Sequence, residues 1–234
     1  MRVARSEGQG RLPRMATFAV TLEERMTVLD ALFQIQSHQD PSLSFRCACR
    51  VGMCGTCAMS INAVPRLACK TQANRLATST ITIGPLPNLP VIKDLVVSLE
   101  PFFAHWKRIK PALHSKGRES TEAVRIPATS PYSRSTEGKR DCITCGICHA
   151  ACGVVGTDGA FLGPAAINKA FLRLMDPRDD ATDDRLVTLN GERDGVWRCH
   201  TQFNCTAACP KRIDLTDTIS RLKRGLASPS AFNK

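Results

Sequence analysis

The sequence predicts an α+β protein of two domains, a small mixed β-sheet over one helix in residues 1–105 and an all-helical domain in residues 106–234. Three observations support this prediction. Short runs rich in β-branched residues surround a single amphipathic helix in the first half. The second half has helix-period apolar patterns and no strand-like alternation. The twelve cysteines form separate groups with different spacing in the two halves, which indicates two distinct metal-binding domains.

Composition restricts the class of protein. Of the 234 residues, 43% are hydrophobic, but no apolar run approaches the ~20 residues that span a bilayer, so we do not expect the chain to cross a membrane by itself. Residues 1–14 include four arginines, yet no apolar segment follows them as in a secretory signal. The same stretch contains Glu7 and is not serine-rich, which disfavours an organellar targeting peptide.

The first half is expected to begin with a hairpin and a helix. Strands are predicted over residues 2–5 and 17–22, joined by a loop over residues 6–14. Thr27 should cap the helix, with Asp30 in its first turn. The predicted apolar face of this helix comprises Val28, Leu29, Leu32, Phe33 and Ile35. Three further strands are predicted at residues 58–64, 66–71 and 80–83.

The middle of the chain is expected to connect the two domains. A proline-rich connector at residues 85–90 precedes residues 91–109, which are predicted to be helical in two pieces because Pro101 favours the first turn of a helix. Residues 111–140 carry Pro, Ser, Gly and Arg without periodicity, which predicts an extended crossing. Helices are predicted beyond it at residues 163–175, 180–189 and 215–226.

One cysteine set lies in the first half. It has C-x4-C-x2-C…C spacing and comprises Cys49, Cys54, Cys57 and Cys69, which is the plant-type pattern for a [2Fe–2S] cluster. Gly52 and Gly55 fit a loop that folds tightly around a cluster, since glycine accepts positive φ and lets backbone N–H groups approach sulfur. Cys47 is left over, and we interpret it as a spare thiol near this loop, with redox sensing as the alternative.

Two complementary cysteine sets lie in the second half. The first has C-x2-C-x2-C-x3-C spacing, in which three thiolates bind one cubane and the fourth ligates another cluster. This crossed ligation assigns a [4Fe–4S] cluster to Cys142, Cys145, Cys148 and Cys209, the last followed by Pro210. It assigns the other cluster to Cys152, Cys199 and Cys205. Gln202 stands where a full set has a cysteine, and because an amide is a poor iron ligand, three thiolates predict a [3Fe–4S] cluster.

The net charge of the chain indicates what kind of partner it binds. Its net charge is +11, and since each thiolate-ligated cluster carries about two negative charges, three clusters would cancel about half of it. The remainder suits an acidic protein or an anionic membrane surface. The competing interpretation is a basic zinc protein that binds nucleic acid. It is disfavoured because no groove-reading helix is evident and zinc sites do not require crossed sets.

Over nearly its whole length the chain resembles the iron–sulfur subunits of succinate dehydrogenases and fumarate reductases. The matching residues lie within 49–59, 67–69, 85–95, 142–152, 162–165, 176–179 and 198–211. The resemblance implies an N-terminal β-grasp plant-type ferredoxin domain followed by an all-α, bacterial-type dicluster ferredoxin domain. It also implies an electron path from an FAD-bearing flavoprotein subunit, which performs the dicarboxylate chemistry, through three clusters to a quinone. Hydrophobic membrane-anchor subunits would hold the chain on the cytoplasmic face of the bacterial inner membrane.

Two departures from that family concern the quinone. Gly153 stands where members usually have proline, and Thr157 lies in the region where they usually carry a tryptophan that lines the quinone pocket. His200 matches a family residue near the three-iron cluster and the quinone. We therefore take Thr157 and His200 as candidate quinone contacts, with a hydrogen-bonding role beside the cluster as the alternative for His200. The missing tryptophan leaves open a second function, an adaptor from a related flavoenzyme to a non-quinone acceptor such as a soluble thiol or disulfide system.

Overall fold

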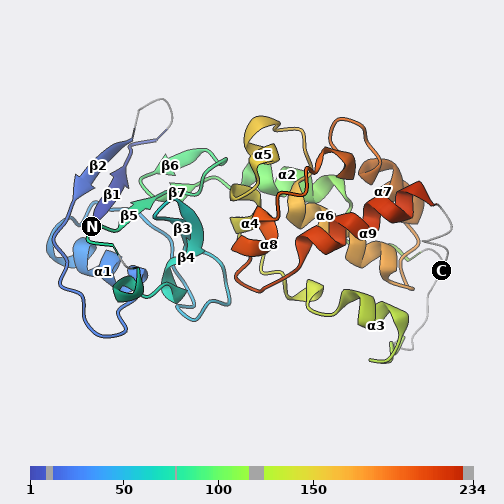
Figure 1. Cartoon of the computed structure of the whole chain (residues 1–234), viewed down its shortest axis with the longest axis horizontal. Coiled ribbons are helices and arrows are strands. Elements are labelled where there is room, and N and C mark those ends of the chain that lie inside the picture. Colours follow the sequence, from blue (N-terminus) through green and yellow to red (C-terminus); the bar gives the residue numbers. More distant parts are fainter. Residues whose placement is uncertain (9–12, 77, 116–123, 229–234) are drawn as a thin grey trace. The chain divides into compact units, whose positions relative to one another are not determined.

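The computed structural model describes residues 1–8, 13–76, 78–115 and 124–228. The chain forms two compact units, which Figure 1 shows coloured along the sequence. The first comprises Met1–Pro101 and Ile143–Ala151, and the second comprises Phe102–Cys142 and Cys152–Lys234. A short piece of the C-x2-C-x2-C-x3-C motif therefore packs with the N-terminal unit, although it lies far along the chain.

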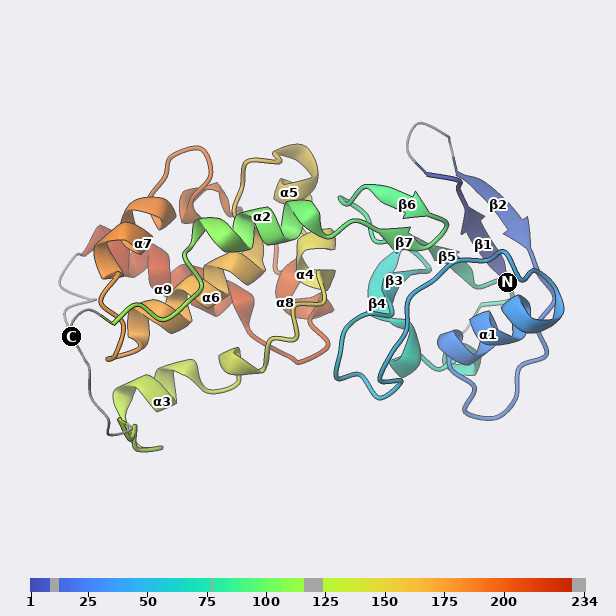
Figure 2. The same ribbon diagram turned by 180° about the vertical axis from the view of Figure 1, so that it is seen from behind.

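The first unit is built on a five-stranded sheet. Its strands are β1 (Arg2–Arg5), β2 (Arg14–Thr17), β3 (Ala58–Ile61), β4 (Val64–Leu67) and β5 (Thr82–Gly84), in the order β2-β1-β5-β3-β4. β1 and β5 pair in parallel, and the other neighbours pair antiparallel. Helix α1 (Val28–His38) lies beside the sheet in both views (Figures 1 and 2). The predicted small mixed sheet over one helix is confirmed.

The cap predicted for α1 is present. Thr27 Oγ1 accepts a hydrogen bond from Asp30 N at 3.2 Å, and Asp30 Oδ2 accepts one from Thr27 N at 3.0 Å. This reciprocal capping box satisfies two backbone N–H groups that a helix start would otherwise leave unpaired. The buried residues of α1 are Val28, Leu29, Ala31, Leu32 and Ile35. Phe33, also predicted for this face, is half-buried and meets Phe45 edge-on, with ring centroids 5.1 Å apart.

The second strand lies earlier than predicted. The four residues of β1 pair with the four residues of β2. The first pair is Arg2 with Thr17 and the last is Arg5 with Arg14. Phe18 N then donates to Met1 O at 2.8 Å, where the partner strand ends. Among the described residues, 18–22 have no strand to pair with, and β-propensity without a partner does not make a strand. The predicted loop over 6–14 lies partly outside the described residues.

The bounds of the later strands also differ from the prediction. β4 begins at Val64 rather than at residue 66, because the chain turns at Asn62 and Ala63, which have φ values of +50° and +62°. β4 then ends at Leu67, and residues 68–70 form a 3-10 turn that carries Cys69. β5 is displaced by a similar amount toward Gly84. Residues other than glycine rarely adopt positive φ, so the sequence gives little indication of such turns. This explains why the predicted bounds of these strands differ from the observed ones.

The segment predicted as a first helical piece is instead a hairpin of β6 (Val91–Lys93) and β7 (Val96–Val97). Asp94 lies between the strands with φ of +48°. Its buried carboxylate accepts hydrogen bonds from Ser6 N and Ser44 N, each at 2.9 Å. These partners are distant in sequence, so a local pattern contains no trace of them. The hairpin conformation is therefore a tertiary effect.

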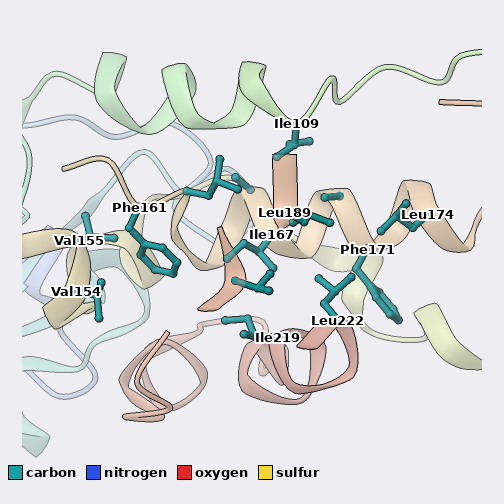
Figure 3. Close-up of a cluster of buried hydrophobic side chains, with 14 residues drawn as sticks. Ile109, Val154, Val155, Phe161, Ile167, Phe171, Leu174, Leu189, Ile219 and Leu222 are labelled. Carbon is teal, nitrogen blue, oxygen red and sulfur yellow. The ribbon is translucent and has the colours of Figure 1, made fainter. Parts of the chain in front are cut away.

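The second unit is all-helical over its described residues, as predicted. Its helices are α2 (Glu100–Arg108), which begins at the end of the first unit, α3 (Pro131–Thr136), α5 (Gly153–Thr157), α6 (Gly163–Met175), α7 (Thr182–Leu189), α8 (Asn204–Ala208) and α9 (Leu215–Ala227). The predicted second-half helices correspond to α6, α7 and α9, and Pro101 lies in the first turn of α2. α6 packs along α9 over a core that includes Phe161, Ile167, Phe171, Ile219 and Leu222 (Figure 3).

Residues 131–136 form α3 within the segment predicted to be extended, part of which lies outside the described residues. Ser130 Oγ accepts from Ser133 N at 3.1 Å, and Pro131 occupies the first turn. Serine before proline is a helix-start signal, and it overrides the absence of apolar periodicity here. None of the described helices has the length and apolar content that crossing a bilayer requires.

A buried arginine holds the chain just after α2. Arg185 donates to the carbonyl oxygens of Ile109 at 3.1 Å, Lys110 at 2.8 Å and Ala112 at 2.9 Å. It also forms an ion pair with Asp179, and both side chains are almost completely buried. A buried charge is tolerated only when it is paired and hydrogen-bonded, and Arg185 meets both conditions.

Candidate iron–sulfur cluster sites

The loop from Cys49 to Cys57 is shaped to present sulfur atoms. Gly52 and Gly55 have φ values of +78° and +76°, which L-residues adopt only with strain, so the predicted need for glycine is met at both positions. Cys49 Sγ accepts N–H groups from Met53 at 3.2 Å and Cys54 at 3.3 Å. The pKa of Cys49 falls to about 6 because backbone N–H groups, first that of Val51 and then that of Cys54, stabilise its thiolate.

The other two cysteines of this set lie beside two strands of the sheet. Cys57 immediately precedes β3 and Cys69 follows β4, and Ala68 N donates to Cys57 O at 3.1 Å, which joins the two segments. Both cysteines are buried, and burial raises the pKa of Cys57 to about 12. The iron ions of a bound cluster would supply the positive charge that keeps such thiols deprotonated. A donor set of four thiols on one glycine-bearing loop and its neighbouring turn fits a [2Fe–2S] cluster.

Two of the four cysteines assigned to [4Fe–4S], Cys145 and Cys148, lie in residues 143–151, which pack with the first unit. Cys148 lies in the short helix α4 (Ile147–Ala150), which follows Gly146 at φ +77°. Their common assignment derives from the crossed spacing, which places three thiolates in one run and the fourth in the other.

The three cysteines assigned to [3Fe–4S] line one open pocket in the second unit. Cys152, Cys199 and Cys205 contribute to it, and its empty volume, including solvent at the mouth, is about 350 Å³. Its other lining residues are Val154, Phe161, Pro164, His200, Thr201, Gln202, Phe203, Asn204, Thr216 and Ile219. Burial raises the pKa of Cys152 and of Cys205. The wall therefore combines thiols, apolar side chains and amide or hydroxyl groups, which suits a cluster with sulfur ligands.

Gln202 occupies this pocket beside the chain that follows Cys152. A Cβ atom built on Gly153 would lie 2.9 Å from Gln202 Oε1. The amide side chain thus reaches from the Cys199–Cys205 loop to the residue after Cys152. Gln202 therefore lines the same pocket as the three cysteines, at the sequence position where a full set would carry a fourth.

The structure brings only one of the two candidate quinone contacts to the pocket. His200 is exposed and lines it. Thr157 is not among the lining residues. Its Oγ1 lies 3.2 Å from both Gly153 O and Val154 O at the end of α5, and its one hydroxyl proton is donated to these carbonyl oxygens. Phe203, which sequence reasoning missed, also lines the pocket with 58% of its surface exposed and φ of +61°. Its only sequence signal was its position between Cys199 and Cys205.

Cys47 is half-buried in the segment before the first cluster loop.

Over the described residues, no group of three or more His, Cys, Asp or Glu side chains is placed to hold a single metal ion.

Comparisons with known proteins cover almost the whole chain. A family model described as a 2Fe-2S iron-sulfur cluster binding domain matches residues 1–104, and one described as a 4Fe-4S dicluster domain matches residues 138–213. The chain is 39% identical over 214 residues to the succinate dehydrogenase [ubiquinone] iron-sulfur subunit 1, mitochondrial, of Oryza sativa subsp. japonica, which covers 91% of this chain and 75% of the relative. It is 38% identical over 222 residues to the fumarate reductase iron-sulfur subunit of Haemophilus influenzae, covering 90% of this chain and 86% of the relative. A solved structure, the Mycobacterium smegmatis Sdh1 complex in the apo form, contains a chain with a TM-score of 0.87 and 26% identity, with 97% of this chain and 95% of that chain covered.

Proposed function

Since the chain belongs to the family of succinate dehydrogenase and fumarate reductase iron–sulfur subunits, we propose that eleven of its twelve cysteines hold three clusters that relay electrons between a flavoprotein and a quinone. The chain is an electron-transfer subunit of a succinate:quinone oxidoreductase, with a plant-type ferredoxin domain before a dicluster domain. We place the domains at residues 1–105 and 106–234. The observation that carries the cluster proposal is that Cys152, Cys199, Cys205 and Gln202 line one pocket.

The proposed ligand sets are those of the sequence pattern. Cys49, Cys54, Cys57 and Cys69 hold [2Fe–2S]; Cys142, Cys145, Cys148 and Cys209 hold [4Fe–4S]; Cys152, Cys199 and Cys205 hold [3Fe–4S]. When bound, such clusters supply one-electron transfer. The residues of this chain set the potentials through burial and through hydrogen bonds to sulfur, such as those from Met53 N and Cys54 N to Cys49 Sγ. Dicarboxylate chemistry belongs to the partner flavoprotein.

The proposed partners are an FAD-bearing subunit, one or more hydrophobic membrane anchors and a quinone, with no role for nucleic acid. We propose a peripheral position on the cytoplasmic face of the bacterial inner membrane. The net charge of +11 supports it, because the part that the clusters leave uncompensated is attracted to an anionic surface.

For the electron exit, we propose that quinone binds beside the [3Fe–4S] pocket and that His200 donates a hydrogen bond to one of its carbonyl oxygens. His200 is exposed at the pocket. Thr157 is the second candidate, but its hydroxyl proton is directed to Gly153 O or Val154 O, so donation to quinone requires breaking that bond. The alternative function, delivery of electrons to a soluble thiol or disulfide acceptor, is retained because the chain has no tryptophan at the usual quinone contact.

The metal content tests this function directly. Anaerobically purified complex should contain roughly nine iron atoms per copy of this chain, the sum of two, four and three. Stoichiometric zinc with little iron would exclude it. Quinone reduction driven by succinate, measured on the complex in membranes, separates the quinone acceptor from the soluble alternative, which predicts transfer to a disulfide acceptor without membranes.

A further inference from the structure

Gly55 lies in the first cluster loop and against a cysteine of the second cluster. A Cβ atom built on Gly55 would lie 2.6 Å from Cys145 Cβ and 3.0 Å from Cys145 Cα. Both residues belong to the same compact unit. Real Cβ atoms essentially never approach other atoms to 2.6 Å, so no residue other than glycine fits here without displacing the chain at Cys145. Backbone on the first loop therefore directly contacts the residue that carries a proposed [4Fe–4S] ligand.

The segment that carries Cys145 is held in the first unit by contacts of its own. Asn88 Nδ2 donates to Ala150 O at 3.0 Å. Helix α4 packs against β4, the strand that leads into Cys69. A Cβ atom on Gly146 would lie 3.4 Å from Leu99 Cδ2, so this backbone also fits closely against its surroundings. These contacts do not involve Gly55, so the segment that carries Cys145 is held in place independently of Gly55. The close approach of Gly55 to Cys145 therefore follows from the packing of this segment and of the first cluster loop within the same unit.

We propose that Gly55 is a positioning residue that sets the separation between the [2Fe–2S] and [4Fe–4S] clusters, and that its contact with Cys145 is the route by which electrons pass between them. The proposal rests on the proposed ligand sets. In the step concerned, one electron leaves the reduced [2Fe–2S] cluster and one electron enters the oxidised [4Fe–4S] cluster; no bond breaks and no proton moves. At this contact the backbone of the first loop touches Cys145, so no open space separates the two segments at this point.

Gly52 supplies a matched control in the same loop. Its φ of +78° equals that of Gly55 within a few degrees, so alanine imposes similar backbone strain at both positions. A Cβ atom on Gly52 would meet Lys70 Cγ at 2.8 Å, and the flexible lysine side chain can move away. Gly55→Ala and Gly52→Ala thus share the strain, and only Gly55→Ala presses on Cys145.

The experiment uses the assembled complex with wild-type chain, Gly55→Ala or Gly52→Ala, examined by electron paramagnetic resonance at stepwise reduction. In the wild type, reduction of the second cluster should broaden the [2Fe–2S] signal and speed its relaxation, because the two spins are close. Gly55→Ala should weaken this interaction and slow electron arrival at [4Fe–4S] more than Gly52→Ala does, because Gly52→Ala carries similar backbone strain without pressing on Cys145.

Two results would overturn the inference. One is a wild-type complex whose two reduced clusters show no mutual broadening, a measurement that remains available if Gly55→Ala does not assemble. The other is an equal interaction in Gly55→Ala and Gly52→Ala. The proposed function is tested separately, by the iron content and by the presence of a [2Fe–2S] signal and a [4Fe–4S] signal. A complex that shows both signals but no difference between the variants would refute only the role of the Gly55 contact.

Discussion

Replacement of Gln202 by cysteine should convert the three-iron cluster into a four-iron cluster. Gln202 lines the pocket together with Cys152, Cys199 and Cys205, so a thiolate at this position completes a set of four. Cysteine is shorter than glutamine, so its sulfur is drawn back from Gly153, toward which the amide now extends. The predicted change is one iron atom, from roughly nine to roughly ten per chain.

The substitution should act on the metal and not on the fold. Gln202 is exposed, and replacement of an exposed residue changes the free energy of unfolding by about 0.5 kcal/mol or less. Gln202→Ser is the control, because it shortens the side chain equally without adding a thiolate. Iron analysis and the paramagnetic signal of the oxidised three-iron cluster provide the assay. That signal should largely disappear in Gln202→Cys and persist in Gln202→Ser. Full retention of the signal in Gln202→Cys would refute the inference that residue 202 faces the cluster.

The remaining predictions concern a spare thiol, the quinone contact and the buried arginine. Cys47→Ser should leave the iron content and the reduced [2Fe–2S] signal unchanged, whereas Cys49→Ser should alter that signal; equal damage would show a wrong ligand set. His200→Ala should weaken quinone binding roughly fivefold, the loss of about 1 kcal/mol from one hydrogen bond, while Thr157→Val stays near wild type in quinone-reduction kinetics. Unchanged kinetics in His200→Ala would remove His200 from the exit site. Arg185→Met should cost about 3–5 kcal/mol in urea unfolding, because it removes the guanidinium that compensates the buried charge of the Asp179 carboxylate. Arg221→Met, at the more exposed ion pair with Asp217, should cost less than about 1 kcal/mol. Similar losses in both variants would contradict this account of Arg185.

Local sequence chemistry determined the helices that begin with clear signals. Thr27 and Asp30 form the capping box of α1, and Gly163-Pro164 opens α6. These interactions join residues within one helical turn, so a short window of sequence contains all of their participants. The cluster families were determined in the same way, because the spacing of cysteines along a loop limits which cluster the loop can enclose.

Only the tertiary structure decided the features that depend on distant partners. Residues 91–97 form a hairpin because Asp94 bonds to Ser6 and Ser44, and the second strand ends at Thr17 because β1 begins at Arg2. The close approach of Gly55 to Cys145 and that of Gln202 to Gly153 likewise join residues from separate segments of the chain. Such contacts form when whole elements pack, and their energy depends on the position of both partners. The sequence therefore determined which residues are chemically able to hold clusters, and the packing of the chain decided which other residues lie beside them.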